Sequence, residues 1–199
     1  MTRLLLIRHG ETDSLGKFLA GRTSGIHLNE AGRRQANMLC ECLRGYEEIA
    51  AVVSSPMERT METAKILACA RGLNVEIDSR FNEFDFGEWT GKSFAELSNH
   101  TLWAEYNRYR SIHRAPGGES LIEVQGRAWK GVQALCGGFP EATLAIVSHA
   151  DVIRSVLMLA LGIPLDNLLR LDIPPASISE ISIGVGEPTV HRIGVFKTG

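Results

Sequence analysis

Arginine and histidine side chains stand directly after short apolar segments of this chain. Arg8 and His9 follow residues 4–7, and His149 follows residues 143–148. Unbroken apolar segments of this length are typical of strands that are buried on both faces of a sheet. In an open α/β sheet, ligands bind outside the carboxyl ends of the strands. We therefore expect these three side chains to meet at one ligand site, with the two imidazoles facing each other.

Two further residues could complete such a site. Arg59 lies in the first turn of a predicted helix, where the helix dipole and the guanidinium both attract an anion. Glu83 lies in an aromatic-rich loop, residues 81–89, and apolar neighbours raise the pKa of a carboxyl group until it can donate a proton near neutrality. Asp85 and Glu88 lie in the same loop, and residue spacing does not rank the three carboxylates.

These residue types suit phosphoryl transfer. A guanidinium binds phosphate oxygens bidentately and keeps its charge at any working pH. A neutral imidazole is a competent nucleophile toward phosphorus, and a positioned acid can protonate the departing oxygen. The motifs of other phosphate chemistries are absent, since no cysteine has an arginine six residues on and no Gly-x-x-x-x-Gly-Lys-Ser/Thr loop occurs. His149 and Asp151 lack further ligands nearby, so we predict no metal site.

Alternating strand and helix patterns predict the elements that hold these residues. Four helices are expected. Three have N-terminal signals, at Asn29, at Ser55 followed by Pro56, and at Ser120, and the fourth is expected to begin at about residue 151. The expected strands cover residues 3–8, 50–54, 73–77, 143–148, 178–183 and 189–196, the last two antiparallel. The expected helices cover residues 30–44, 55–71, a segment from residue 121, and 151–161. This order predicts a three-layer α/β fold.

Length and composition bound the possibilities. The chain has 199 residues and fits a single domain, with an insertion at about residues 92–118. Most of the aromatic residues of this insertion, which include Trp103, Tyr106 and Tyr109, are expected to point inward as structural side chains. Ser93 with Glu96 has capping-box spacing. We expect the insertion to fold over the edge of the sheet.

Charge and hydropathy exclude several partner classes. The net charge of −2 argues against nucleic-acid binding, and no apolar stretch has the length of a membrane span. The first strand begins almost at once, which leaves no room for a signal peptide. The four cysteines match neither a disulfide framework nor a zinc site, so we expect reduced thiols and a cytoplasmic protein.

Six blocks of the sequence resemble, in the same order, the motifs of the histidine phosphatase superfamily, also called phosphoglycerate mutase-like. Together they run from the first strand to about residue 154, roughly three quarters of the chain, and jointly they are highly specific. The blocks are Arg8–Thr12, Leu28–Ala36, Ser54–Ala64, Glu83–Gly91, Pro116–Ser120 and Val147–Arg154.

The resemblance implies a role for each matched residue. His9 would be the nucleophile that forms a phosphohistidine. Arg8, Arg59 and His149 would bind the phosphoryl oxygens, and Glu83 would protonate the leaving group and then activate water. The resemblance also implies a mostly parallel sheet flanked by helices, an insertion over the active site, and catalysis without a metal or cofactor. The substrate-binding residues are expected to include, besides these arginines and the second histidine, Thr12, Gly21 and Arg22.

Departures from the family pattern concern the substrate side. Leu15 stands where many members have asparagine, Ala20 precedes Gly21 where some members have a polar residue, and Ala150 replaces the usual glycine after the second histidine. Arg22 or Thr23 is expected to compensate for the lost polarity. The Glu-Arg-His-Tyr-Gly segment of the mutases is absent, which favours the phosphatase-type branch.

The sequence therefore predicts a phosphomonoesterase that hydrolyses a small phosphorylated metabolite through a phosphohistidine. The alternative is a cofactor-dependent phosphoglycerate mutase or another phosphomutase or phosphotransferase, which would pass the phosphoryl group to a second hydroxyl. A non-catalytic relative that binds phospho-ligands is less favoured, because all five core positions are filled. The expected partner is a small phosphorylated substrate, with neither nucleic acid nor membrane. The oligomeric state is left open, a homodimer included.

Overall fold

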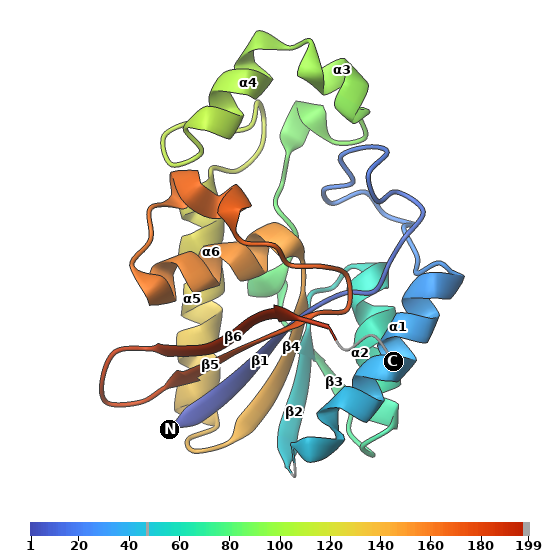
Figure 1. The fold of residues 1–199 in the computed structure, drawn as a ribbon, viewed down its shortest axis with the longest axis vertical. Coiled ribbons are helices and arrows are strands. Elements are labelled where there is room, and N and C mark those ends of the chain that lie inside the picture. The colour runs from blue at the N-terminus through green and yellow to red at the C-terminus, as the bar shows by residue number, and fades with distance from the viewer. Residues whose placement is uncertain (47, 197–199) are drawn as a thin grey trace.

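A six-stranded sheet forms the centre of the computed structural model, which describes residues 1–46 and 48–196 (Figure 1). The strand order is β3-β2-β4-β1-β5-β6. The first four strands are parallel, β5 is antiparallel to β1, and β6 is antiparallel to β5. The strands are β1 Thr2–Arg8, β2 Ile49–Ser54, β3 Val75–Ile77, β4 Thr143–Ser148, β5 Ile178–Ile183 and β6 Thr189–Val195. The six predicted strands and the antiparallel final pair are confirmed.

Helices cover both faces of this sheet. Leu4 and Leu6 of β1 pack in one apolar cluster with residues of the last two helices, and Leu5 and Ile7 pack in a second cluster with residues of the first two. A strand covered on both faces needs apolar side chains at every position, which explains the unbroken segment at residues 4–7. The helices are α1 Glu30–Cys42, α2 Glu58–Cys69, α3 Phe94–Ser98, α4 Thr101–Arg108, α5 Leu121–Gly138 and α6 Ala150–Leu161. The predicted three-layer α/β/α fold with a mostly parallel sheet is confirmed.

The predicted helix starts are confirmed except for one. The side chain of Asn29 caps α1, and Ser93 and Ser120 each form a capping box. By contrast, α2 begins only at Glu58, so the prediction of a Ser55 cap with Pro56 in the first helical position is wrong. The amide of Ser55 still bonds to the sheet, at the carbonyl of Val147, and its hydroxyl lies 2.8 Å from a ring nitrogen of a histidine. The hydroxyl is thus engaged in tertiary contacts and does not cap α2.

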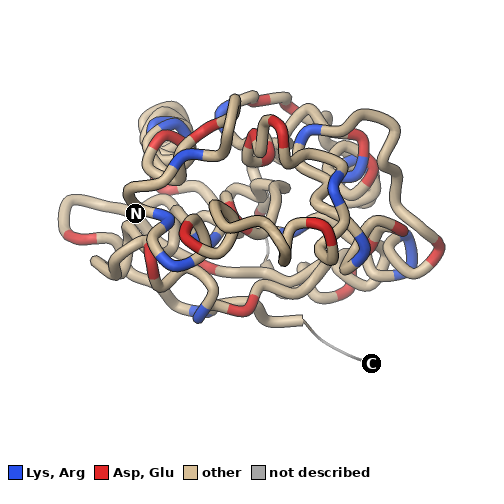
Figure 2. Tube along the Cα trace, turned by 90° about the horizontal axis from the view of Figure 1, so that it is seen from above, with Lys and Arg blue, Asp and Glu red and all other residues tan. Residues whose placement is uncertain are grey.

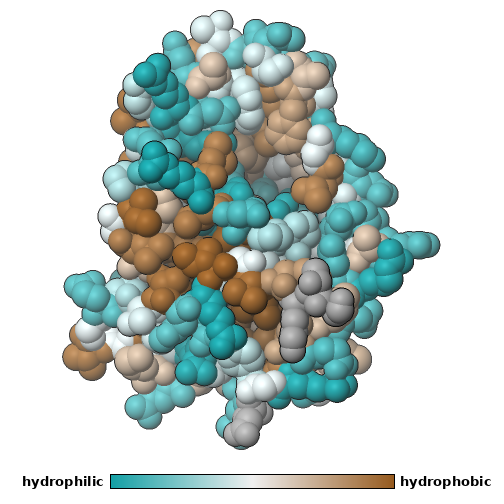
Figure 3. Space-filling view, in the orientation of Figure 1, coloured by the Kyte–Doolittle hydropathy of each residue, from teal (hydrophilic) through white to brown (hydrophobic). Residues whose placement is uncertain are grey.

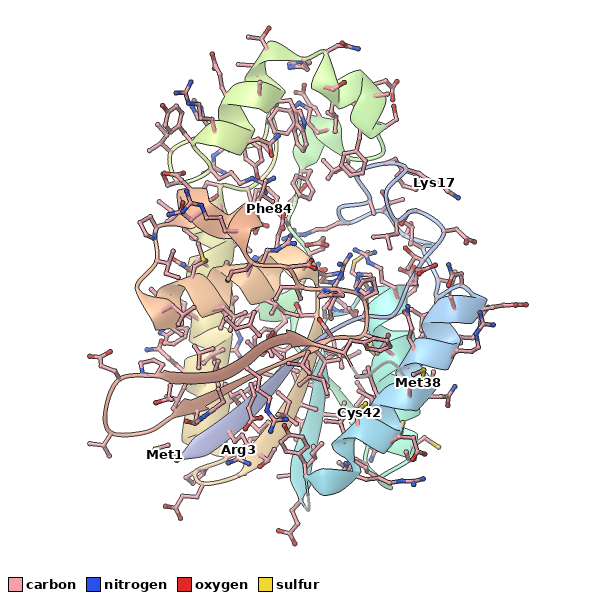
Figure 4. All side chains as sticks on the ribbon, viewed as in Figure 1. Met1, Arg3, Lys17, Met38, Cys42 and Phe84 are labelled. Atoms are coloured by element: carbon pink, nitrogen blue, oxygen red, sulfur yellow. The ribbon has the colours of Figure 1, made fainter. Side chains whose placement is uncertain are left out.

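The inserted segment forms two short helices, α3 and α4, at the top of Figure 1. Tyr106 is almost fully buried, and its ring lies 5.1 Å from that of Trp89 and 6.1 Å from that of Phe84. Figure 4 shows Phe84 between the insertion and the rest of the molecule. The expectation that most of these aromatics point inward is confirmed by Tyr106 and by Trp103, which stacks on it, while Tyr109 is 43% exposed.

The surface carries charges of both signs. Figure 2 shows Lys and Arg residues interspersed with Asp and Glu residues around the chain trace. Among the described residues, no helix is both long enough and apolar enough to cross a bilayer.

Candidate active site

Three neighbouring parallel strands, β1, β2 and β4, end at the same edge of the sheet. The predicted residues Arg8, His9, Arg59 and His149 lie at these ends or shortly after them in the chain. β1 pairs with β4 at Arg8 and Ser148, and β2 pairs with β4 on its other side. His9 follows β1 and His149 follows β4, so their rings come together with centroids 5.3 Å apart and an interplanar angle of 64°. The expectation that the two imidazoles face each other across the sheet edge is confirmed.

A cavity of about 290 Å³ opens at this edge and collects most of the predicted residues. This volume lies at the lower end of the range for ligand pockets, which suits a small ligand. Figure 3 shows apolar residues beside a hollow in the upper half of the molecule. The charged residues that line the cavity are Arg8, Arg59, Glu83, Arg110, Asp151 and Arg154, and its apolar wall includes Leu15, Phe18, Leu19, Phe86, Phe94, Trp103 and Leu169.

His9 has the geometry of a neutral nucleophile. Its Nδ1 lies 2.7 Å from the carbonyl oxygen of Gly10 and donates to it, because a carbonyl only accepts. This bond places the lone pair on Nε2. Burial, followed by the positive charges of Arg59 and Arg8, lowers the pKa of His9 well below its ordinary value. The imidazole is therefore uncharged at neutral pH, with its one proton on Nδ1, and its Nε2 can attack phosphorus.

His149 is held in the opposite tautomer. Its Nε2 lies 2.8 Å from the hydroxyl of Ser55, and that hydroxyl also accepts from the amide of Met57 at 3.3 Å. An Oγ that accepts from an amide has its own hydrogen available for Nε2, which favours the proton on Nδ1. Burial, then the charges of Arg59 and of the nearby groups, lowers the pKa of His149 well below its ordinary value. Among the described residues, Nδ1 has no hydrogen-bond partner. His149 is fully buried and does not itself line the cavity, but its ring packs against that of His9, which does.

The two arginines of the site each keep a guanidinium nitrogen without a partner. Arg59 is 1% exposed, donates from one terminal nitrogen to the carbonyl of Gly21 at 2.8 Å, and leaves the other unbonded. Arg8 donates to the carbonyl of Ile173 at 2.7 Å, and its Nε is buried and unbonded. Buried donors without acceptors are costly, and their convergence beside two imidazoles indicates a place for an anion.

Glu83 is poised to exchange a proton near neutral pH. Burial is the largest influence and raises the pKa of Glu83 to about 7, against the opposing charge of Arg59. Its Oε2 lies 3.8 Å from a terminal nitrogen of Arg59 and 3.4 Å from Nδ1 of His149. Asp85 and Glu88, the alternative carboxylates, do not line the cavity. The geometry therefore singles out Glu83 among the three.

An ion-pair network behind the cavity fixes the backbone of Glu83. Arg22 and Arg127 donate to its carbonyl oxygen at 2.9 and 3.1 Å, and both guanidinium groups also bond to the carboxylate of Glu119. Glu119 accepts in addition from the amide of Asp85 at 3.1 Å. Arg22 does not line the cavity, so the structure does not bring it to the substrate side, where the sequence had placed it. The only sequence signal for Glu119 was its position in the matched block at residues 116–120.

Some of the remaining predicted residues line the cavity and others do not. Thr12 and Gly21 line the cavity, and the hydroxyl of Thr12 lies 2.8 Å from that of Ser14. The departures Leu15, Ala20 and Ala150 also line it, so the cavity wall is apolar at these three positions. Arg22 and Thr23, which were expected to compensate for the missing polar side chains, do not line the cavity.

Two further arginines line the cavity, and the sequence analysis had given neither of them a role. Arg110, from the segment after α4, lies 3.2 Å from one oxygen of Asp151, and Arg154 lies 2.9 Å from the other. Asp151 is therefore paired with arginines and is not arranged with His149 as a metal ligand. Within residues 1–46 and 48–196, no group of three or more His, Cys, Asp or Glu side chains could hold a metal ion. The signal for Arg110 was weak, because a single arginine in a polar insertion has no pattern, whereas Arg154 closes the matched block at residues 147–154 and had been given no role.

The sequence matches a known protein family. The family model for the histidine phosphatase superfamily (branch 1) matches residues 4–195. A bifunctional protein of Mycobacterium tuberculosis is 39% identical over an alignment of 184 residues that covers 89% of this chain and 49% of that protein. The chain thus spans about half the length of the first relatives it matches.

Two further comparisons cover most of both chains. The glucosyl-3-phosphoglycerate phosphatase of Mycobacterium tuberculosis is 31% identical over 175 residues, 83% of this chain and 78% of that protein. The solved structure of Bacillus stearothermophilus YhfR superposes with a TM-score of 0.90 at 28% identity, over 99% of this chain and 98% of that one. The fold is therefore shared with a known group of proteins.

Proposed function

The chain belongs to the histidine phosphatase superfamily (branch 1), and we propose that it is a phosphomonoesterase that acts on a small phosphorylated metabolite. The single observation that carries this proposal is the convergence of a neutral, buried His9 with the unbonded guanidinium nitrogens of Arg8 and Arg59. A relative that is named as a phosphatase of a phosphorylated metabolite supports it.

In the first step, Nε2 of His9 attacks the phosphorus atom and the bond from phosphorus to the ester oxygen breaks. Arg8, Arg59 and Nδ1–H of His149 bind the phosphoryl oxygens and stabilise the charge that develops on them. Glu83, whose raised pKa keeps a large protonated fraction at neutral pH, gives its proton to the departing alkoxide. The products of this step are an alcohol and a phosphohistidine.

In the second step, water takes the place of the alcohol. The carboxylate of Glu83, now ionised, removes a proton from the water molecule as its oxygen attacks phosphorus. The bond from phosphorus to Nε2 breaks, and His9 leaves as a neutral imidazole with its Nδ1–H still on the carbonyl of Gly10. Inorganic phosphate is released and Glu83 is protonated again. Thr12 and Gly21 would contact the substrate from the cavity wall.

Phosphate release separates the candidate functions. The purified chain is incubated with an aryl phosphate and with a panel of phosphorylated metabolites, with and without an acceptor alcohol. We expect stoichiometric release of inorganic phosphate and alcohol, unchanged by exhaustive chelation of metals. Transfer to the acceptor without free phosphate would establish a phosphotransferase instead. Binding of the esters without any turnover would establish a non-catalytic relative.

Other expectations remain predictions of the same proposal. We propose that residues 1–199 act as a single domain, with the segment at about residues 92–118 as its insertion. A cytoplasmic location agrees with four cysteines that are free in the structure. Vanadate and inorganic phosphate should inhibit competitively, because both would occupy the site between the arginines and the imidazoles.

A further inference from the structure

A segment outside the matched sequence blocks holds the strand end that bears the nucleophile. This segment, residues 172–177, leads into β5. The carbonyl of Ile173 accepts from a terminal nitrogen of Arg8 at 2.7 Å, and the amide of Arg8 donates to the last residue of the segment at 3.1 Å. The carbonyl of His9 accepts from the amide of Ala176, also at 3.1 Å. The segment is thus bonded to both residues that begin the proposed active site.

The backbone of this segment is stiff. The rings of Pro174 and Pro175 fix their φ angles, and a proline also restricts the residue before it. The amide of Ser177 closes a turn on the carbonyl of Pro174 at 3.1 Å. Ala176, fully buried in this turn, has φ +57°, a left-handed conformation that a residue with a Cβ atom adopts only when its surroundings impose it. A displacement of the segment is therefore passed on to its carbonyl groups, because the backbone has little freedom to absorb it.

Gly194 of β6 lies directly against this segment. It has φ +60° and stands where the register between β5 and β6 shifts. A Cβ atom on Gly194 would lie 2.4 Å from the carbonyl oxygen of Asp172 and 3.3 Å from Cδ of Pro174. The amide of Gly194 is held by Oγ of Ser179 at 3.0 Å. A side chain at residue 194 must therefore displace the segment, since the obstructing atoms belong to backbone and to a proline ring.

Arg8 is the active-site residue that such a displacement reaches. Its guanidinium lines the cavity, with one terminal nitrogen held by Ile173 and a buried Nε without a partner. When the Ile173 carbonyl moves, the guanidinium follows it and loses its alignment with an anion in the cavity.

From these contacts we infer that Gly194 is a positioning residue for Arg8. The space left by its missing side chain lets the 172–177 segment hold the guanidinium toward a bound anion. The inference rests on the proposed function for the identity of that anion as a phosphoryl group, but anion binding itself is measured without turnover.

The affinity of the Gly194→Ala variant for inorganic phosphate tests this role. Phosphate binds without reacting, and titration calorimetry measures its Kd. We expect the Kd to rise roughly ten- to a hundredfold, the usual value of a charge-assisted hydrogen bond that is lost. A Kd equal to that of the wild type would overturn the inference.

Gly162→Ala is the matched control. Gly162 follows α6, has φ +64°, and has no atom within 4 Å of the position of a Cβ atom. This variant imposes the same left-handed backbone on an alanine without the contact, so its phosphate Kd should stay within about twofold of the wild type. Thermal unfolding shows that both variants are folded at the temperature of the titration. An equal loss of phosphate affinity in the two variants would contradict the role of the contact.

A double-mutant cycle separates a positioning role from a general loss of structure. Arg8→Ala alone should weaken phosphate binding. In that background, Gly194→Ala should raise the Kd by less than about twofold, because the residue through which Gly194 acts is already absent. A further tenfold rise in the double variant would show that Gly194 does not act through Arg8.

Ala176→Gly tests the same segment if Gly194→Ala does not fold. The left-handed backbone of Ala176 suits glycine, so this variant should fold. It makes the turn more flexible and should raise the phosphate Kd roughly threefold, with no rise in the Arg8→Ala background. An unchanged Kd in Ala176→Gly would then overturn the inference.

Failure of the inference and failure of the proposed function give different results. Hydrolysis of esters by the wild-type chain, with unchanged phosphate affinity in Gly194→Ala, refutes only the positioning role. Weakened phosphate binding in Gly194→Ala, without hydrolysis of any ester by the wild-type chain, refutes only the proposed phosphatase activity.

Discussion

Individual side chains in this cavity have proton affinities set by burial and by their neighbours. Burial and two arginines keep His9 and His149 neutral, and burial raises the pKa of Glu83 to about 7. Nucleophile and acid are therefore both in their reactive forms at the same pH, an arrangement that general acid–base catalysis requires. The roles follow from the environment of each residue as much as from its type.

The first prediction concerns Glu83 as the general acid. Glu83→Gln should slow hydrolysis of an alkyl phosphate roughly a hundred- to ten-thousandfold, the usual range for general acid catalysis. An ester with a good phenolate leaving group needs no proton and should lose far less in the first step. Steady-state kinetics on the two substrates measures the difference, and rapid mixing with the phenolic ester should show a burst of phenol if the second step becomes limiting.

Asp85→Asn is the matched control for this prediction. Asp85 lies in the same loop, is 39% exposed at its side chain and does not line the cavity. We expect a small and equal effect on both substrates. A leaving-group dependence in Asp85→Asn that is absent from Glu83→Gln would show that the acid is misassigned.

At the scale of elements, close backbone approach holds the nucleophile loop in place. The loop after β1 lies directly on the first turn of α1, and a Cβ atom on Gly32 would lie 2.1 Å from the carbonyl oxygen of Glu11. Asn29 caps α1 and also donates to the carboxylate of Glu11 at 3.0 Å. The N-terminus of the helix thus positions Gly10 and Glu11, the two residues that follow His9.

The second prediction tests this contact. Gly32→Ala must displace the loop or the helix, because the obstructing atom is backbone. We expect a loss of roughly 1–3 kcal/mol of unfolding free energy, typical of overpacking, together with a clear fall in kcat. Denaturant titration and steady-state kinetics measure the two effects.

Gly126→Ala, on α5, is the matched control for Gly32→Ala, because this glycine has no close neighbour. A Cβ atom there meets no other atom, so removing a helical glycine should stabilise the protein by roughly 0.5–1 kcal/mol and leave kcat unchanged. Equal stability in the two alanine variants would mean that the loop does not depend on the close approach.

The elements also show what sequence can predict. Strands and caps depend on local patterns, such as four apolar residues before Arg8 or the spacing of Ser120 and Glu123, and these predictions are confirmed. Ser55 was assigned wrongly because its partner, His149, is 94 residues away, and the same local pattern suits a helix cap. Arg110 was missed for a related reason, since its place in the cavity wall depends on an ion pair with Asp151, 41 residues away.

At the scale of the whole molecule, the site reduces stability at high pH. The pKa of Glu83 is about 7 in the folded protein and near its ordinary value of 4.5 when unfolded. The folded state thus binds more protons between these values, so the free energy of unfolding falls as pH rises from about 4.5 to 7 and then stays level for this group.

The third prediction follows from that sign. Glu83→Gln removes the ionisation. The unfolding free energy of the variant minus that of the wild type should therefore be larger at pH 8 than at pH 4.5, by up to roughly 3 kcal/mol. Thermal unfolding of both proteins across this range measures the difference. A constant offset between the two proteins at all pH values would show that Glu83 ionises as an ordinary carboxyl group.

The central claim of this account is a phosphoryl group carried on His9, and trapping that intermediate tests it most directly. The chain is mixed with a ³²P-labelled ester, quenched in base within one turnover, and digested for peptide mapping. We predict acid-labile, base-stable phosphate on the peptide that contains His9, and none in His9→Ala. Hydrolysis without such an intermediate, or phosphate attached to any other residue, would contradict the account.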